Sequence, residues 1–195
     1  MIAHELFNEY INSLKEAIAE IDLTELERIV DMLQEAQENA WQVFLFGNGG
    51  AAATASHFVC DLTKTAAVPG KPRLRAISLT ENIAMITAIA NDISYDDIFV
   101  EQMSALWNRG DLAIGISASG NSPNVLKAIE YAKNHGGKTI GFSGFGGGKL
   151  AKLADINVTF SSRNYGVVED MQLVLNHLIA QALRQRLQEQ VSQAK

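Results

Sequence analysis

A hydroxyl-rich turn is the segment of this chain best equipped to bind an anion. The run Ser117-Ala118-Ser119-Gly120-Asn121-Ser122-Pro123 follows apolar residues and precedes an amphipathic segment, which predicts a strand, a turn and a helix. Ser122 suits the N-cap of that helix, and Pro123 suits its first turn. Backbone N–H groups and a partial positive charge gather at a helix start, and the hydroxyls and the Asn121 amide add neutral donors. Because the run contains no Lys or Arg, we expect it to hold the phosphate of a small metabolite by hydrogen bonds.

A second turn, Gly47-Asn48-Gly49-Gly50, ends an earlier apolar run and leads into a helical segment. A tight strand-to-helix turn accounts for these glycines about as well as ligand binding does. The turn lacks the Gly-Lys-Ser/Thr of a phosphate-binding nucleotide loop, and residue 52 is alanine where a dinucleotide fingerprint needs its third glycine. The sequence therefore predicts no nucleotide cofactor.

Two pairs of titratable residues lie at helical spacings. His57 and Asp61 are four residues apart and share a helix face, although such a pair is commonly only a surface hydrogen bond. Small residues at 51–53 and 55 would let that face pack closely against a ligand or another subunit. Glu169 and His177 lie in an otherwise apolar run, about 12 Å apart along the helix axis and roughly 80° apart around it. A solvated stripe with a hydrogen-bonded core histidine is the alternative interpretation of that second pair.

Hydrophobic periodicity predicts the elements that position these residues. Apolar runs indicate five strands, at 43–46, 74–79, 112–116, 138–143 and 156–160. Helical spacing indicates helices at 6–18, 24–39 with a Thr24–Glu27 capping box, 51–62, 81–90, 98–107, 124–135 and from 167 past 187, with a polar loop at 91–97. This alternation is typical of an α/β fold, a three-layer sandwich whose five-stranded parallel sheet is covered by helices on both faces. Ligands bind beyond the carboxyl ends of such strands, where both turns lie.

Composition limits the classes of function. A chain of 195 residues that is 47% hydrophobic suits a single domain, 1–195, with a helical N-terminal part at about 1–40. The net charge of −6 argues against nucleic acid and anionic membrane as partners. The single cysteine, Cys60, excludes an internal disulfide and fits a reducing compartment. We see neither a signal peptide nor an apolar run of membrane-spanning length, so we expect a cytoplasmic protein.

Taken together, these segments resemble the sugar isomerase (SIS) family. The resemblance is carried by Gly47-Asn48-Gly49-Gly50, His57-Phe58, Ala90-Asn91-Asp92, the run 117–122 and the helix with Glu169 and His177. It covers nearly the whole chain and implies a flavodoxin-like SIS fold preceded by helices. It also implies a homotetramer with active sites at subunit interfaces, and a bound zinc ion in some members. Within the family, the chain is most similar to members that act on sedoheptulose 7-phosphate.

The chain departs from the family pattern at four positions. It has Ala51 in place of serine, Asp61 in place of glutamate, Ala118 in place of threonine and Glu169 in place of glutamine. Aspartate is one methylene shorter than glutamate, and a misplacement of about 1 Å can cost on the order of a hundredfold in rate. The two imidazoles and two carboxylates of this chain, however, are a stronger set of metal ligands than the family pattern offers. They suit Zn²⁺, or alternatively Mn²⁺, Ni²⁺ or Fe²⁺.

The resemblance implies an aldose–ketose isomerase that acts on a phosphorylated sugar through an enediol. The substrate that we expect first among such sugars is sedoheptulose 7-phosphate. Asp61 and His177 are then the expected acid–base pair. The expected substrate contacts are Asn48, Gly49, Gly50, Asp92, Ser117, Ser119, Gly120, Asn121, Ser122 and Glu169. The expected ligands of one zinc ion per subunit are His57, Asp61, Glu169 and His177.

The alternative is a non-catalytic SIS protein that binds a phosphosugar or a protein partner, as the member associated with the bacterial replication initiator does. The shorter Asp61 and the lost hydroxyls favour this alternative. His57 and His177 disfavour it, because a scaffold has no chemical need for them.

Overall fold

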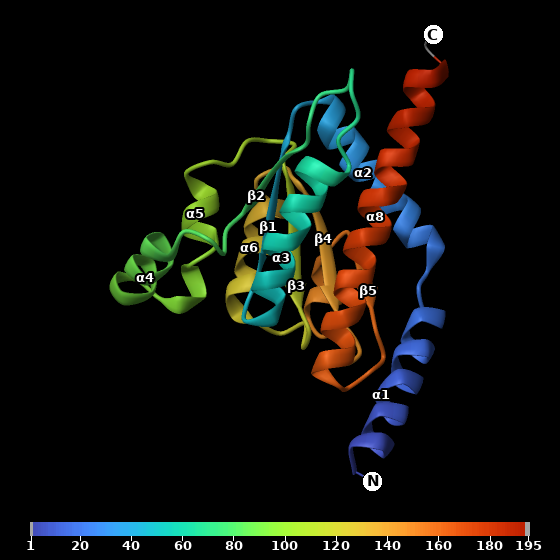
Figure 1. The fold of residues 1–195 in the computed structure, drawn as a ribbon. Coiled ribbons are helices and arrows are strands. Elements are labelled where there is room, and N and C mark those ends of the chain that lie inside the picture. The colour runs from blue at the N-terminus through green and yellow to red at the C-terminus, as the bar shows by residue number, and fades with distance from the viewer. Residues whose placement is uncertain (1, 194–195) are drawn as a thin grey trace.

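The computed structural model describes residues 2–193 and places one parallel β-sheet between two layers of helices (Figure 1). Its five strands run in the order β2-β1-β3-β4-β5, and every neighbouring pair is parallel. They are β1 Gln42–Gly47, β2 Arg75–Ser78, β3 Leu112–Ser117, β4 Lys138–Ser143 and β5 Ile156–Thr159. The predicted α/β architecture with a five-stranded parallel sheet is therefore confirmed.

Both faces of the sheet are buried, as expected for parallel strands. Val43 and Leu45 of β1 join one hydrophobic cluster, whereas Phe44 and Phe46 join the other. The first cluster lies under α2 Leu23–Glu38, α3 Gly50–Cys60 and α8 Tyr165–Gln193. The second lies under α4 Ile83–Asp92, α5 Val100–Ser104, α6 Pro123–Asn134 and α7 Leu150–Leu153.

Several local structures differ from the predicted elements. The predicted Thr24–Glu27 capping box is wrong, because α2 begins at Leu23 and the carboxylate of Asp22 caps it by accepting from the N–H groups of Thr24 and Glu25. The helix predicted to end at residue 62 instead continues from α3 into a π-helical turn, η1 Asp61–Thr65. The loop predicted at 91–97 contains a short 3₁₀ helix, η2 Tyr95–Asp97.

No helix within residues 2–193 is both long enough and apolar enough to cross a membrane.

The first helix, α1 Ile2–Ala19, extends beyond the sheet and touches the first turns of α8 (Figure 1). Tyr10 on α1 makes this connection, and its hydroxyl donates a 2.6 Å hydrogen bond to Asp170 Oδ2. Burial, that hydrogen bond and the negative charges of Asp170 and Glu169 raise the pKa of Tyr10 from 10.0 to about 12. The contact therefore favours the neutral phenol.

This shift predicts a dependence of stability on alkaline pH. Since the pKa of Tyr10 is higher in the folded chain than in the unfolded one, its contribution is fully present below pH 10.0 and is lost as the pH rises through about 12. We expect Tyr10→Phe to lose less stability than the unchanged protein across this window, measured by urea unfolding at constant ionic strength. Tyr131→Phe, which leaves the α1–α8 contact intact, is the control. Identical pH slopes for Tyr10→Phe and the unchanged protein would contradict the shift.

Candidate active site

The serine turn, residues 117–123, forms the predicted strand–turn–helix. β3 ends at Ser117, Ser122 is the N-cap of α6, and Pro123 is its first residue. The hydroxyl of Ser122 makes no capping bond and instead lies 3.0 Å from the hydroxyl of Ser117. Pro123 has no N–H, and the N–H of Val125 donates to Asn124 Oδ1 at 2.9 Å, so an anion at this helix start would meet the N–H of Asn124 and the two paired hydroxyls.

Gly120 and Asn121 hold this turn in shape. Gly120 has a φ of +64°, and a Cβ there would collide with the carbonyl of Gly147, so only glycine fits. The Asn121 amide donates to the carbonyl of Ser119 at 2.8 Å, and its Oδ1 accepts from the N–H of Lys149 at 3.2 Å. The turn is thus braced against the loop that follows β4.

A cavity of about 180 Å³ opens beside the serine turn. Its walls combine the turn with the ends of β1 and α8, and they are Asn48, Ala51, Ile116, Ser117, Ala118, Ser119, Ser122, Tyr165 and Glu169. The structure therefore brings together five of the predicted substrate contacts. Ala51 and Ala118, the two positions that lack the hydroxyl of the family pattern, line the same space.

Asn48 is fixed by partners that the sequence did not reveal. Its side-chain amide and that of Asn124 exchange two hydrogen bonds of 2.9 Å, and the hydroxyl of Tyr95 donates to Asn48 Oδ1 at 3.0 Å. Asn124 is only 1% exposed. A polar residue directly after the N-cap and proline of α6 was the one available signal for this contact.

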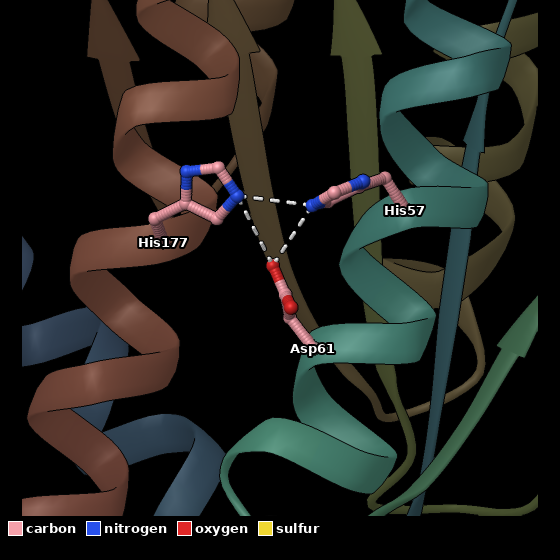
Figure 2. Close-up of side chains that lie close together, drawn as sticks. All are labelled: His57, Asp61 and His177. Carbon is pink, nitrogen blue, oxygen red and sulfur yellow. Dashed lines mark hydrogen bonds and ion pairs between the residues drawn. The ribbon is translucent and has the colours of Figure 1, made fainter.

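His57, Asp61 and His177 meet between α3 and α8 (Figure 2). The Nε2 atoms of the two histidines lie 3.0 Å apart. Asp61 Oδ2 lies 3.2 Å from His57 Nε2 and 3.7 Å from His177 Nε2. The predicted partnership of these three residues is present within one chain.

The environment of this group fits a divalent cation. The imidazoles are half exposed, whereas the Asp61 side chain is 11% exposed. Thr65 donates to Asp61 Oδ1 at 3.1 Å, but the buried Oδ2 has no hydrogen-bond donor among residues 2–193. A buried carboxylate oxygen without a donor is costly, and a cation held with the two imidazoles would satisfy it. Two His nitrogens and one carboxylate oxygen are also the ligands of zinc sites that keep a position open for substrate.

Glu169 does not join this group, so the structure supports three of the four predicted metal ligands. The Glu169 carboxylate occupies the position that a Cβ on Gly50 would take, at the serine-turn end of the α3–α8 contact. The eight residues from Glu169 to His177 place them about 12 Å apart along α8, and their side chains do not converge. Glu169 lines the cavity instead.

The remaining predicted contacts lie outside that cavity. Gly49 is the N-cap of α3, with a φ of +58°, and Gly50 begins the helix. Gly49 lines a smaller hollow of about 100 Å³ with Asn48 and Tyr95. Asp92 is exposed at the end of α4 and accepts a hydrogen bond from the side chain of Asn91.

Comparison with known proteins agrees with this geometry. The SIS domain family matches residues 6–144. The chain belongs to the SIS domain family.

A probable phosphoheptose isomerase of Thermoplasma acidophilum is 40% identical over 88% of this chain and 93% of its own length. The phosphoheptose isomerase of Aliarcobacter butzleri is 40% identical over 83% of this chain and 85% of its own length. The solved structure of a phosphoheptose isomerase from Francisella tularensis superposes with a TM-score of 0.88, at 29% identity, and covers 95% of this chain and 100% of that one. Within the SIS domain family, the chain therefore belongs with the phosphoheptose isomerases.

The histidine pair predicts metal binding. We expect the protein to bind one Zn²⁺ per chain, and we expect His57→Ala and His177→Ala each to weaken binding at least tenfold because each removes one of three ligands. Isothermal titration of the metal-stripped protein measures this. His135→Ala, on the exposed end of α6, is the control. Unchanged affinity in both histidine variants would show that the group holds no metal.

Proposed function

We propose that this protein interconverts sedoheptulose 7-phosphate and the corresponding aldose, a heptose 7-phosphate, through an enediol. The observation that carries the proposal is the spacing of two sites along one helix contact. Along the contact between α3 and α8, the serine-turn cavity lies at the level where Gly50 meets Glu169. The histidine pair lies further along, at the level where His57 meets His177. Seven residues of α3 and eight of α8 separate these levels, about 10–12 Å.

That spacing suits a long sugar phosphate. An extended seven-carbon chain spans on the order of 10 Å from C1 to the phosphorus atom. With its phosphate in the serine turn, the substrate would place C1 and C2 beside Asp61 and His177. A five- or six-carbon sugar phosphate held by the same turn would fall short of them.

The neutral serine turn would bind the phosphate through the hydroxyls of Ser117, Ser119 and Ser122. The N–H groups of Gly120 and Asn121 donate within the turn, to the Ser117 carbonyl at 2.9 Å and to the Ser119 hydroxyl at 3.2 Å, and so hold its shape. Glu169 and Asn48 would accept and donate hydrogen bonds to sugar hydroxyls between the two levels. Because no Lys or Arg among residues 2–193 lines this cavity, the phosphate would be held without an ion pair, which favours release of product.

Isomerisation moves one proton between C1 and C2. In our proposal the Asp61 carboxylate removes a proton from C1 of the ketose while His177 protonates the carbonyl oxygen at C2, which gives the enediol. The proton then returns to C2 as the C1 hydroxyl loses its own, which gives the aldose. Where His57, Asp61 and His177 hold a zinc ion, the ion would polarise the carbonyl as a Lewis acid in place of the proton that His177 otherwise donates.

We also propose that the protein is cytoplasmic and works as a homotetramer whose neighbouring subunits complete each site. Large apolar side chains remain exposed on α4 and α1 of this chain, as expected of surfaces that pack against another subunit. They include Ile83, Met85, Ile2, Leu6 and Phe7. Asp92 ends the exposed helix α4, so it would contact sugar bound to a neighbouring chain.

The test is an isomerase assay on sedoheptulose 7-phosphate beside pentose and hexose phosphates, with and without EDTA. We expect turnover of the heptulose, loss of activity in EDTA and recovery with Zn²⁺. Binding of sugar phosphates without turnover of any would overturn the proposal and favour a non-catalytic binding protein.

Asp61 gives the sharpest single variant. We expect Asp61→Asn to lower kcat at least 100-fold, because the amide cannot accept the proton from carbon. Asp31→Asn, on the exposed side of α2, is the matched control. Full activity of Asp61→Asn would remove the carboxylate from the mechanism.

A further inference from the structure

A basic hollow lies at the other end of the α3–α8 contact from the serine turn. Its volume is about 500 Å³, and its walls come from η1, the loop before β2 and the middle of α8. Among the described residues that line it, half are cationic and none is acidic. The lining residues are Lys64, Ala67, Val68, Pro69, Gly70, Lys71, Arg73 and Arg184. None of them lines the cavity beside the serine turn.

The two arginines are held in place by neutral partners. Arg73 Nη1 donates to the carbonyl of Thr63 at 2.9 Å, and Arg184 Nη1 donates to the carbonyl of Thr65 at 3.1 Å. Both acceptors belong to the same π-helical turn, so both guanidinium groups are anchored to η1 and line one hollow. Each guanidinium keeps further N–H groups free, because it carries five donors in total.

The charges of this hollow are not neutralised within the described chain. Lys64, Lys71, Arg73 and Arg184 form no ion pair with a carboxylate of residues 2–193. Lys71 instead donates to the side-chain carbonyl of Gln190 at 2.7 Å. Four cations gathered around one hollow are unexpected in a chain of net charge −6. A planar guanidinium pair matches phosphate oxygens, and two further ammonium groups favour more than one phosphate.

We propose that this basic hollow is an effector site for a metabolite that carries a diphosphate group. Thr65 connects the hollow to Asp61, because its carbonyl accepts from Arg184 and its hydroxyl donates to Asp61 Oδ1. A diphosphate bound to the free N–H groups of Arg184 draws the guanidinium away from the Thr65 carbonyl and loosens the turn that orients Asp61. Occupation of the hollow therefore lowers kcat. The binding site stands on its own, whereas its effect on turnover rests on the proposed isomerase function.

Binding is tested first, with inorganic pyrophosphate as the probe and no sugar present. By isothermal titration of the metal-free protein, we expect one pyrophosphate per chain, bound at least tenfold more tightly than orthophosphate. Arg73→Gln and Arg184→Gln should each weaken binding at least tenfold. Arg75→Gln is the matched control, because Arg75 also donates to a backbone carbonyl, that of Ala40, but lies outside the hollow.

Two binding results would overturn the effector site. In the first, the unchanged protein and both arginine variants bind pyrophosphate with equal affinity, whereas Ser122→Ala loses binding. That result would place pyrophosphate in the serine turn. The other is absence of binding together with a change of oligomeric mass in Arg73→Gln and Arg184→Gln, measured by light scattering. That result would assign the hollow to an interface between subunits.

Turnover is tested second, at saturating sedoheptulose 7-phosphate and with Zn²⁺ in excess of pyrophosphate. We expect pyrophosphate to lower kcat at least twofold in the unchanged protein and in Arg75→Gln, but not in Arg184→Gln. Inhibition that persists in Arg184→Gln would come from competition or metal removal and would contradict the coupling. An inactive protein that still binds pyrophosphate in the hollow would count against the proposed function and not against the site.

Discussion

The close approach of α3 and α8 is the constraint on which the candidate active site depends. Gly50 has no side chain where the Glu169 carboxylate lies, and the small side chains of Ala51 and Ala55, one turn apart on α3, are also buried. Further along, the amide of the buried Asn176 donates to the carbonyl of Thr54 at 3.3 Å. Because small residues let the two helices pack this closely, His57 on one helix reaches His177 on the other.

The parallel sheet supplies the second fixed point. β1 and β3 are neighbours, so the glycine turn after one and the serine turn after the other lie at the same edge. The side-chain amides of Asn48 and Asn124 join these turns directly by hydrogen bonds, and the hydroxyl of Tyr95 donates a further hydrogen bond to Asn48. The phosphate end of the candidate site is therefore set by the sheet, whereas its proton-transfer end is set by the helices.

Sequence reasoning reached those features that depend on local periodicity. Alternating apolar runs and amphipathic segments predicted the five strands, and the spacing of His57 and Asp61 predicted that they share a face. Ser122 and Pro123 marked the start of α6 because capping chemistry is local.

The features that it missed depend on how distant elements pack. Glu169 was counted among the metal ligands because two imidazoles and two carboxylates suit zinc, but the packing of α8 against α3 places its carboxylate beside Gly50 and the cavity instead. The pairing of Asn48 with Asn124 joins residues 76 positions apart, and no local pattern predicts it. The π-helical turn that positions Thr65 beneath Asp61 has no recognised sequence signature in this segment. Asp92 is exposed at the end of α4, outside the cavity, and its predicted contact with the sugar stays a prediction.

Proton transfer at carbon is the most direct test of the account, because it is the step assigned to Asp61. The measurement is ¹H NMR of sedoheptulose 7-phosphate turned over by the metal-loaded protein in D₂O, beside Asp61→Asn and the control Asp31→Asn. The account predicts solvent deuterium at C2 of the aldose for the unchanged protein and the control, and at least 100-fold slower incorporation for Asp61→Asn. Incorporation by Asp61→Asn at the unchanged rate, or no incorporation by any of the three proteins, would contradict it.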